Sequence, residues 1–341
     1  MKPRALLHAM AFAASLISFP AFAQSEAEWK KVTEAAMKEG KAVVYSGYLS
    51  PETHNAINAA FKAKYGISVD VLTGRGGELR ERLRLEHQTG RFLVDVYHMA
   101  LAITSINLGE DKTIVPHGGL PDAANLTPGM AARANDKVVP IFTITYGFLY
   151  NSAMVTPEDA PNSWNDLLDP KWRGKIMMDD PRASGGGRVF FHMTYDKYGR
   201  PFHEKLAAQN PTFIRDYNEA ARRVARGEYP IYLPLILGAY DKIKALPIKY
   251  VIPAEGVTYG SYGISVMANA PHPNAARLLA NFYLGQEAQA IYAKTGHGIV
   301  IGNLKEKLSP EVDAMATAKP LVDEDFTRID EHFKNAKEIY K

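Results

Sequence analysis

The sequence predicts an α/β protein whose strands form mostly parallel sheets covered by helices. Two observations support this prediction. Short apolar runs alternate with segments of helical periodicity from residue 25 to residue 98, and the same alternation returns between residues 175 and 253. Consecutive parallel strands need a long crossover, usually a helix, so this alternation is typical of parallel sheets. A chain of 341 residues is long enough for two such units.

The first half of the chain provides the clearest alternation. Val32 and Ala36 are spaced as on one face of a helix, Gly40 follows as a helix end, and Val43-Val44-Tyr45 is typical of a buried strand. The predicted helices cover residues 25–38, 51–65 and 78–89, and the predicted strands cover residues 41–47, 66–72 and 94–98.

Small and polar residues follow these strands, at the edge where parallel sheets bind ligands. Ser46 ends the first strand, and Arg75 and Gly76 stand in the turn Thr73–Gly77 after the second. The turn does not have the spacing of a dinucleotide-binding fingerprint. We expect these residues to face a ligand. The alternative is a tight turn that carries a solvated arginine.

The second half begins with a long β-rich run at residues 138–151, which we expect to cross between two lobes. A strand-like run at residues 259–267 is expected to return the chain to the first lobe. The other predicted strands cover residues 175–178, 227–234 and 248–253; the predicted helices cover residues 188–198, 201–208, 218–226, 273–286, 286–295 and 333–340, with further helix starts at 163 and 240.

A glycine-rich loop, Asp180–Arg188, connects one of these strands to a helix. Ser184 is suited to cap the helix, and the three glycines that follow allow backbone N–H groups to approach a ligand closely. A helix N-terminus with exposed N–H groups favours anions. Arg182 and Arg188 flank the loop with positive charge. The alternative interpretation is a surface loop that caps an ordinary helix.

The charge balance and the lack of cysteine narrow the classes of function. The chain has 40 Lys and Arg against 37 Asp and Glu, a formal net charge of +3, which does not favour a nucleic acid or a membrane surface. The absence of cysteine excludes thiol nucleophiles, cysteine-ligated metal sites, disulfides and a lipid-anchored N-terminal cysteine. We therefore expect no nucleic-acid partner.

The N-terminus has the three parts of a secretory signal peptide. Met1–Arg4 is basic, Ala5–Ile17 is mostly apolar, and Ala21 and Ala23 form a small-residue cleavage motif. The apolar run is too short for a typical membrane span. The sequence therefore predicts that residues 1–23 are cleaved after Ala23 and that the rest is exported to the periplasm.

Motifs of catalysis are missing. The sequence contains no His-Glu-x-x-His, no Gly-x-Ser-x-Gly and no Walker lysine. The histidines, His54, His98 and His192 among them, lack metal-ligand spacing, and we interpret them as surface or turn residues. The acidic pair Asp179-Asp180 is placed to orient Arg182. A secreted hydrolase with a carboxylate pair stays open as an alternative, but we expect no enzyme.

With these features in order, the chain resembles a type II periplasmic substrate-binding protein of an ABC importer, and most of all the ferric-iron-binding branch. The resemblance covers nearly all of the chain after the predicted signal peptide. It depends on the segments Val43–Gly47, Leu93–Val96, Thr145–Asn151, Trp164–Leu167, Asp169–Lys175, Asp180–Gly185, Ala225–Glu228 and Asn269–Ala276.

The resemblance implies two α/β lobes, each a mostly parallel sheet flanked by helices, joined by two crossing strands and closing over a ligand. On this basis we expect residues 24–138 and 261–305 to form the first lobe, and residues 139–260 and 306–341 to form the second. It also implies a membrane permease as partner. We expect a monomer with no cofactor.

The iron-binding members of this family use a His after the first strand, a Glu after the third, and two adjacent tyrosines in the second lobe. By alignment by eye, those positions fall near Leu49, Ala100, Leu237 and Gly238, and none of these side chains binds ferric iron through a phenolate or a carboxylate. We therefore expect no protein-bound metal. A metal carrier that uses exogenous anions remains an alternative.

The glycine-rich loop is retained, and in relatives it holds the synergistic anion through backbone N–H groups. We therefore expect the ligand to be a small organic solute that carries a phosphate, phosphonate or carboxylate group. Polar groups from both lobes are expected to line the cleft. The expected ligand-binding residues are Ser46, Arg75, Gly76, Thr145, Arg182, Ser184, Gly185, Gly186, Arg188 and Tyr232.

Overall fold

The computed structural model describes residues 25–47, 49–74, 76–101, 112–183 and 185–341. The predicted signal peptide, Arg75 and Ser184 lie outside the described residues. Within the described ranges, no helix combines the length and the apolar character needed to cross a bilayer.

The first lobe confirms the predicted alternation of helices and strands. Ser25 accepts a hydrogen bond from the Glu28 N–H in a capping box that starts the first helix, and Gly40 ends it in the left-handed conformation at φ 67°. The elements are α1 (Glu26–Glu39), β1 (Lys41–Ser46), α2 (Pro51–Tyr65), β2 (Ser68–Thr73), α3 (Gly76–Gln88) and β3 (Val96–Ala100). Strand β1 pairs in parallel with both β2 and β3.

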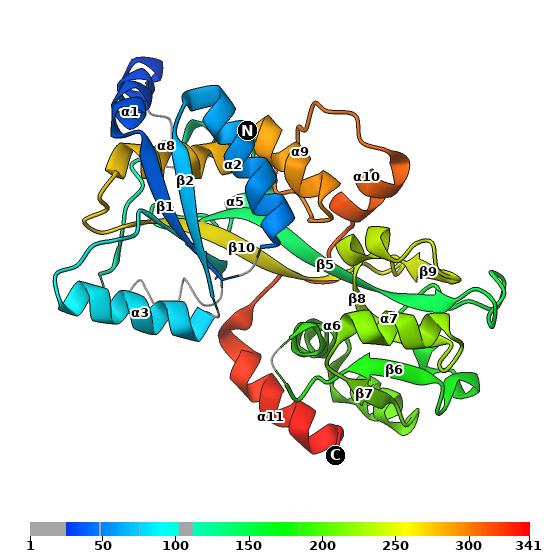
Figure 1. Ribbon diagram of the computed structural model, residues 1–341. Coiled ribbons are helices and arrows are strands. Elements are labelled where there is room, and N and C mark those ends of the chain that lie inside the picture. The colour runs from blue at the N-terminus through cyan, green and yellow to red at the C-terminus, as the bar shows by residue number, and fades with distance from the viewer. Residues whose placement is uncertain (1–24, 48, 75, 102–111, 184) are drawn as a thin grey trace, which may run out of the picture.

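Two long strands connect the lobes, as predicted. Strands β5 (Val139–Asn151) and β10 (Thr258–Met267) pair antiparallel to each other. Strand β10 pairs with β3 of the first lobe, and β5 pairs with β8 (Ile231–Ile236) of the second. The strands therefore form one sheet in the order β2-β1-β3-β10-β5-β8-β6-β7, and Figure 1 shows β5 and β10 running between the two halves of the molecule.

The second lobe repeats the parallel arrangement. Strand β6 (Ile176–Asp179) pairs in parallel with β7 (Thr212–Ile214) and with β8, while β9 (Ile248–Val251) pairs antiparallel with β5. The helices predicted at residues 188–198 and 201–208 are confirmed; they meet within α6 (Gly186–Ala208) at a kink where Gly199 takes the non-helical φ of 71° and Pro201 follows. Helix α7 (Tyr217–Ala225) completes this lobe.

The C-terminal third returns to both lobes. Helices α8 (Pro273–Leu284) and α9 (Gln286–Lys294) pack in the first lobe, and α11 (Ile329–Ile339) packs against α6 in the second. Helix α10 (Pro310–Ala316) lies beside α9 (Figure 1), while its Met315 joins an apolar cluster of the second lobe. Helix α10, within the range 306–341 predicted for the second lobe, contacts both lobes.

Several short elements were not predicted, or not in this form. The helix starts expected at 163 and 240 are short 3₁₀ helices, η2 (Asn165–Leu168) and η4 (Leu237–Lys242), because Pro170 follows the first and Pro247 with strand β9 follows the second. The remaining elements are β4 (Ile114–Val115), η1 (Pro121–Asn125), α5 (Pro128–Ala131), η3 (Pro170–Trp172) and η5 (Phe326–Arg328).

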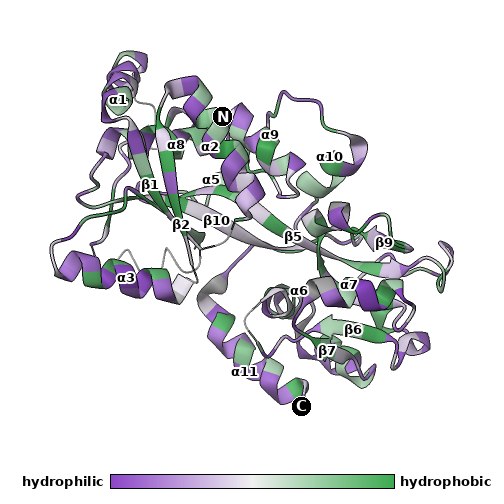
Figure 2. Cartoon of the chain, in the orientation of Figure 1, coloured by the Kyte–Doolittle hydropathy of each residue, from purple (hydrophilic) through white to green (hydrophobic). Residues whose placement is uncertain are grey.

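Separate apolar clusters lie on the two sides of the crossing strands. In the first lobe Phe61 packs edge-on against Phe282, and in the second Trp164 packs against Phe148 and Phe190. Figure 2 shows hydrophobic residues along the strands and mixed polarity on outer helices such as α3 and α11. All residues of β5 are buried, so this strand anchors both lobes.

Candidate functional site

The glycine-rich loop is folded tightly against the end of β6. The helix after it starts at Gly186, with Gly185 as its cap, and the Gly187 N–H donates to Asp179 Oδ2 at 2.7 Å. A Cβ on Gly187 would clash with the backbone of Asp179 and Asp180, so only glycine fits there. The sequence thus forms the predicted strand–loop–helix connection at the positive end of a helix dipole.

A carboxylate already stands at this helix N-terminus. Asp179 lies close to the loop, because a Cβ on Gly185 or Gly186 would come within 3.4 Å or 3.2 Å of its Oδ2. Burial raises the pKa of Asp179, although hydrogen bonds from the backbone of Gly187 and Asp180 oppose the rise. A half-buried negative charge therefore borders the place where we expected only an external anion.

Arg182 is bound by its own loop. Its Nε and Nη2 donate to the two carboxylate oxygens of Asp180 at 2.8 and 3.0 Å, and its Nη1 donates to the Tyr340 carbonyl at 2.9 Å. The guanidinium also lies over the Phe213 ring, 4.5 Å from its centroid. Asp180 orients Arg182, as the sequence suggested, but the same contact neutralises the charge that we expected to face an anion.

Arg188 faces the C-terminal helix. Its Nη2 donates to Asp330 Oδ1 at 3.0 Å, and its guanidinium lies 4.5 Å from the centroid of the Phe333 ring. The side chain is three-quarters buried beneath α11. The expectation that Arg188 supplies charge to the loop is therefore not supported by this arrangement, because the first turn of α6 turns this residue towards α11.

The crossing strand β5 presents Tyr146, not Thr145, to the loop. A Cβ on Gly186 would lie 2.9 Å from Cε1 of Tyr146, so the ring and the loop are in close contact. Side chains alternate along a strand, and Thr145 is on the opposite face. There it lines a cavity of about 430 Å³ with Tyr259 and residues of α10. The alternation of side chains along a strand separates Tyr146 from Thr145. It could not show which of the two meets the loop, because β5 is buried on both faces.

Ser46 lies at the end of β1 as predicted, but it is enclosed. Its Oγ is hydrogen-bonded to His98 Nδ1 at 2.8 Å and to His54 Nε2 at 3.1 Å, and its exposed fraction is 0%. The interpretation of these histidines as surface or turn residues is wrong, because both are buried. Burial lowers the pKa of His98 to about 3 and that of His54 to about 4.

This cluster of Ser46, His54 and His98 pairs a serine with histidines, as acyl-transfer enzymes do. A general base works best with a pKa near the operating pH, and the serine must reach its substrate. The low pKa of His98 and the complete burial of Ser46 meet neither condition. The arrangement gives no support to the hydrolase alternative.

Two other expected residues also have defined places. Gly76 is the first residue of α3, so it lies where the turn after β2 meets that helix. Tyr232 is 1% exposed and belongs to an apolar cluster with Leu149 and Met177. Tyr232 is therefore a core residue of the second lobe in this structure, because the neighbouring strands and α7 cover the face of β8 that we expected to line a cleft.

Two of the four positions at which the resemblance implies iron ligands are apolar and buried here. Leu49 and Leu237 are 7% and 0% exposed. Gly238 lies against the backbone of Gly296 so closely that a Cβ would overlap the Gly296 carbonyl. No larger residue fits at that position without a backbone shift, and neither Leu237 nor Gly238 offers a phenolate. Among the described residues, the group with metal-site geometry is elsewhere, on α6 and α11.

Comparison with known proteins identifies the family. A model of the bacterial extracellular solute-binding proteins matches residues 43–297. The chain belongs to this family. A putative 2-aminoethylphosphonate-binding periplasmic protein from Salmonella paratyphi A is 26% identical over 253 residues, which cover 71% of this chain and 72% of that protein.

Solved structures confirm the fold of this solute-binding protein. The periplasmic binding protein AfuA from Actinobacillus pleuropneumoniae, with exogenous fructose-6-phosphate bound, has a TM-score of 0.64 at 22% identity over 88% of this chain and 96% of AfuA. Iron-bound HitA from Pseudomonas aeruginosa has a TM-score of 0.67 at 21% identity over 88% and 99%. The two-lobed fold and the resemblance to type II periplasmic substrate-binding proteins of ABC importers are thus confirmed.

Proposed function

We propose that this solute-binding protein captures a small anionic organic solute between its lobes in the periplasm and delivers it to the membrane permease of an ABC importer. The solute carries a phosphate, phosphonate or carboxylate group. The observation that supports this proposal is the Gly185–Gly187 loop, which starts α6 beside the Tyr146 ring. Helix starts of this kind favour anions through N–H groups and the helix dipole.

Asp179 narrows the class of solute. A purely anionic ligand at the loop would stand beside a half-buried carboxylate, and the two charges would repel. A solute that also carries an ammonium group would pair this group with Asp179 while its anionic group meets the loop. We therefore favour a zwitterionic solute such as an aminophosphonate. The name of the Salmonella relative, a putative 2-aminoethylphosphonate-binding protein, agrees with this choice.

Iron transport by the same fold is the second candidate, because HitA binds iron on a similar scaffold. The four positions expected for iron ligands hold Leu49, Ala100, Leu237 and Gly238, which counts against this candidate. An iron carrier without those ligands would need exogenous anions for each bond to the metal. Export with cleavage after Ala23 and a monomeric state are part of the proposal.

Calorimetric titration of the mature chain with 2-aminoethylphosphonate, fructose-6-phosphate, inorganic phosphate, citrate and ferric iron tests the proposal. We expect the aminophosphonate to bind most tightly. Asp179→Asn should weaken its binding at least about tenfold, since a charge-assisted pair is lost, and should strengthen inorganic phosphate by removing repulsion. Asp70→Asn, at an exposed pair on β2, is the matched control. Binding of ferric iron alone would overturn the proposal.

A further inference from the structure

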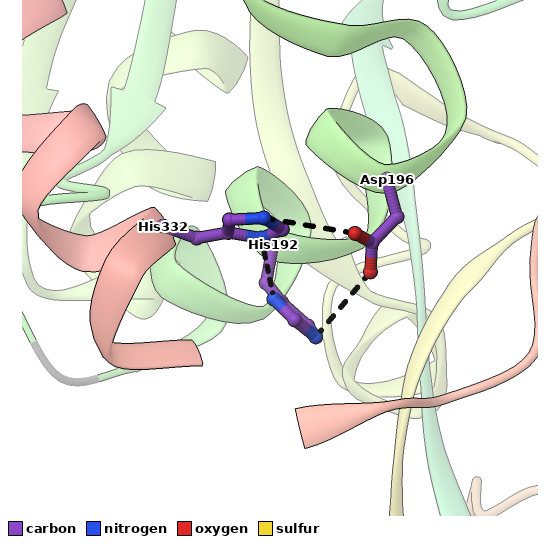
Figure 3. Close-up of side chains that lie close together, drawn as sticks. All are labelled: His192, Asp196 and His332. Atoms are coloured by element: carbon purple, nitrogen blue, oxygen red, sulfur yellow. Dashed lines mark hydrogen bonds and ion pairs between the residues drawn. The ribbon is translucent and has the colours of Figure 1, made fainter. Parts of the chain in front are cut away.

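Three side chains from two helices converge at the interface between α6 and α11. His192 and Asp196 lie one turn apart on α6, and His332 comes from α11, 140 residues later in the sequence (Figure 3). His192 Nε2 is 3.6 Å from Asp196 Oδ2, and His332 Nε2 is 3.7 Å from Asp196 Oδ1. One ligand atom from each residue lies within 4.8 Å of the other two. Helical spacing alone reveals only the first pair.

The hydrogen bonds fix where the imidazole protons lie. His192 Nε2 is 2.6 Å from the carbonyl oxygen of Asp325, which only accepts, so this nitrogen carries a proton. In the neutral ring, His192 Nδ1 is then an acceptor, and His332 Nδ1–H donates to it at 2.8 Å. The lone pair of a neutral His332 is left on Nε2.

This lone pair has no hydrogen-bond partner among the described residues. His332 Nε2 is buried, its side chain is 1% exposed, and it faces the carboxylate of Asp196. A lone pair and a carboxylate oxygen that face each other repel unless a positive charge stands between them.

We propose that α6 and α11 hold a divalent transition-metal ion of the Zn²⁺ class between His332 Nε2, the Asp196 carboxylate and His192 Nε2. Two imidazoles and a carboxylate form a common zinc ligand set, with water in the fourth position. Tetrahedral zinc separates such ligand atoms by about 3.3 Å, which is close to the distances between Asp196 and the two rings.

Binding requires two local changes. The single proton of neutral His192 shifts through solvent from Nε2 to Nδ1, which frees the Nε2 lone pair for the metal and releases the Asp325 carbonyl. Because His332 Nδ1 also carries a proton, the contact between the two Nδ1 atoms opens in the same step. Arg328 Nη1, 3.7 Å from Asp196 Oδ1, moves away from the metal; it is half exposed and already pairs with Glu331 at 3.1 Å. Because α11 also covers Arg188 in the first turn of α6, a bound ion would fasten α11 to the helix that carries the glycine-rich loop. The proposed zinc ligands are different from the positions expected for iron ligands, which are Leu49, Ala100, Leu237 and Gly238.

Zinc titration of the metal-free, tag-free mature chain tests this site, with thermal unfolding as a second measurement. We expect one Zn²⁺ per chain, a raised melting temperature, and a Co²⁺ spectrum typical of four-coordinate nitrogen and oxygen ligands. Asp196→Asn and His332→Gln should each weaken Zn²⁺ at least about tenfold and abolish the thermal shift.

Asp330→Asn is the matched control, because it removes an acid from α11 that pairs with Arg188 and not with the three ligands. Asp196 is at the surface, so its variant should keep the fold even if His332→Gln does not; far-ultraviolet circular dichroism checks this. Failure of the wild-type chain to bind Zn²⁺ at micromolar concentration would overturn the proposal. Equal zinc affinity in the wild type and Asp196→Asn would also overturn it.

Discussion

The carboxyl ends of β1 and β6 occupy equivalent places in the two lobes, but the polar groups at the two strand ends have different hydrogen-bond partners. At the end of β1, Ser46 is enclosed by the neutral rings of His54 and His98. At the end of β6, backbone N–H groups of a helix start meet the carboxylate of Asp179. In the proposed function, the second lobe therefore offers charge and dipoles to the solute, while the first has a closed, uncharged cluster at the equivalent place.

This difference suggests that recognition of charge is concentrated in the second lobe. A buried, neutral serine–histidine cluster, in which both rings are hydrogen-bonded to Ser46, gives a charged solute little to bind. The backbone N–H groups of the glycine-rich loop stay hydrogen-bond donors at any physiological pH, because they do not titrate. The following changes test that division, from the largest expected effect to the smallest.

Gly187→Ala should have the largest effect. The added Cβ would collide with the backbone of Asp179 and Asp180, which cannot move without opening the loop. We expect a loss of about 1–3 kcal/mol in unfolding free energy, as for other overpacked sites, and a loss of solute affinity of at least about hundredfold. Calorimetry and urea unfolding measure the two effects.

Gly129→Ala is the control for Gly187→Ala, because a Cβ at position 129 meets no atom within 4 Å. It should leave both stability and affinity near those of the wild type. Unchanged solute affinity in a folded Gly187→Ala protein would show that the loop does not hold the solute.

His98→Asn should change the acid stability of the first lobe and leave solute affinity unchanged. Burial lowers the pKa of His98 from 6.5 to about 3, so the unfolded chain takes up a proton near pH 6.5 that the folded chain refuses. This contribution to stability is complete above about pH 6.5 and is lost as the pH falls towards 3. Between pH 7 and pH 5 the variant should lose about 2 kcal/mol less than the wild type.

Denaturant unfolding at the two pH values measures the effect of His98→Asn. Its baseline stability at pH 7 should fall, because the bond to Ser46 changes, so the comparison uses the difference between the two pH values. An equal acid loss in both proteins would contradict the assignment. A tenfold loss of solute affinity would place the histidine cluster in the binding site and end the contrast between the lobes.

The sequence predicted the local elements and the order of the fold well. Helix α2 runs over the predicted residues 51–65 because Ser50 caps its start and Gly66 ends it at φ 73°. The crossing strands β5 and β10 were also predicted, since their length and β-rich composition are local properties. The loop before α6 was found through its glycines, which report backbone geometry directly.

The side-chain environments were harder to predict, because they depend on contacts across the fold. Ser46 was expected at a ligand-facing edge, but α2 and β3 bring two histidines over it. Tyr232 was placed in a cleft, although β8 is buried on both faces and its alternation carries no information about side. His332 gave no signal at all, because its partner His192 is 140 residues away.

Arg188→Gln should have the smallest effect. Arg188 pairs with Asp330, whose side chain is 91% exposed, and such pairs contribute less than about 1 kcal/mol to stability. The packing of its guanidinium on Phe333 adds a modest amount. If the arginine only fastens α11 to α6, solute affinity should change less than about twofold. Asp330→Asn removes the same ion pair from the other side; it should match Arg188→Gln in affinity and cost less stability, because the guanidinium stays on the Phe333 ring. A large loss of affinity in Arg188→Gln alone would mean that the arginine leaves Asp330 and turns to the loop when the solute binds. The second lobe would then recognise the anion with a side-chain charge as well as with backbone donors.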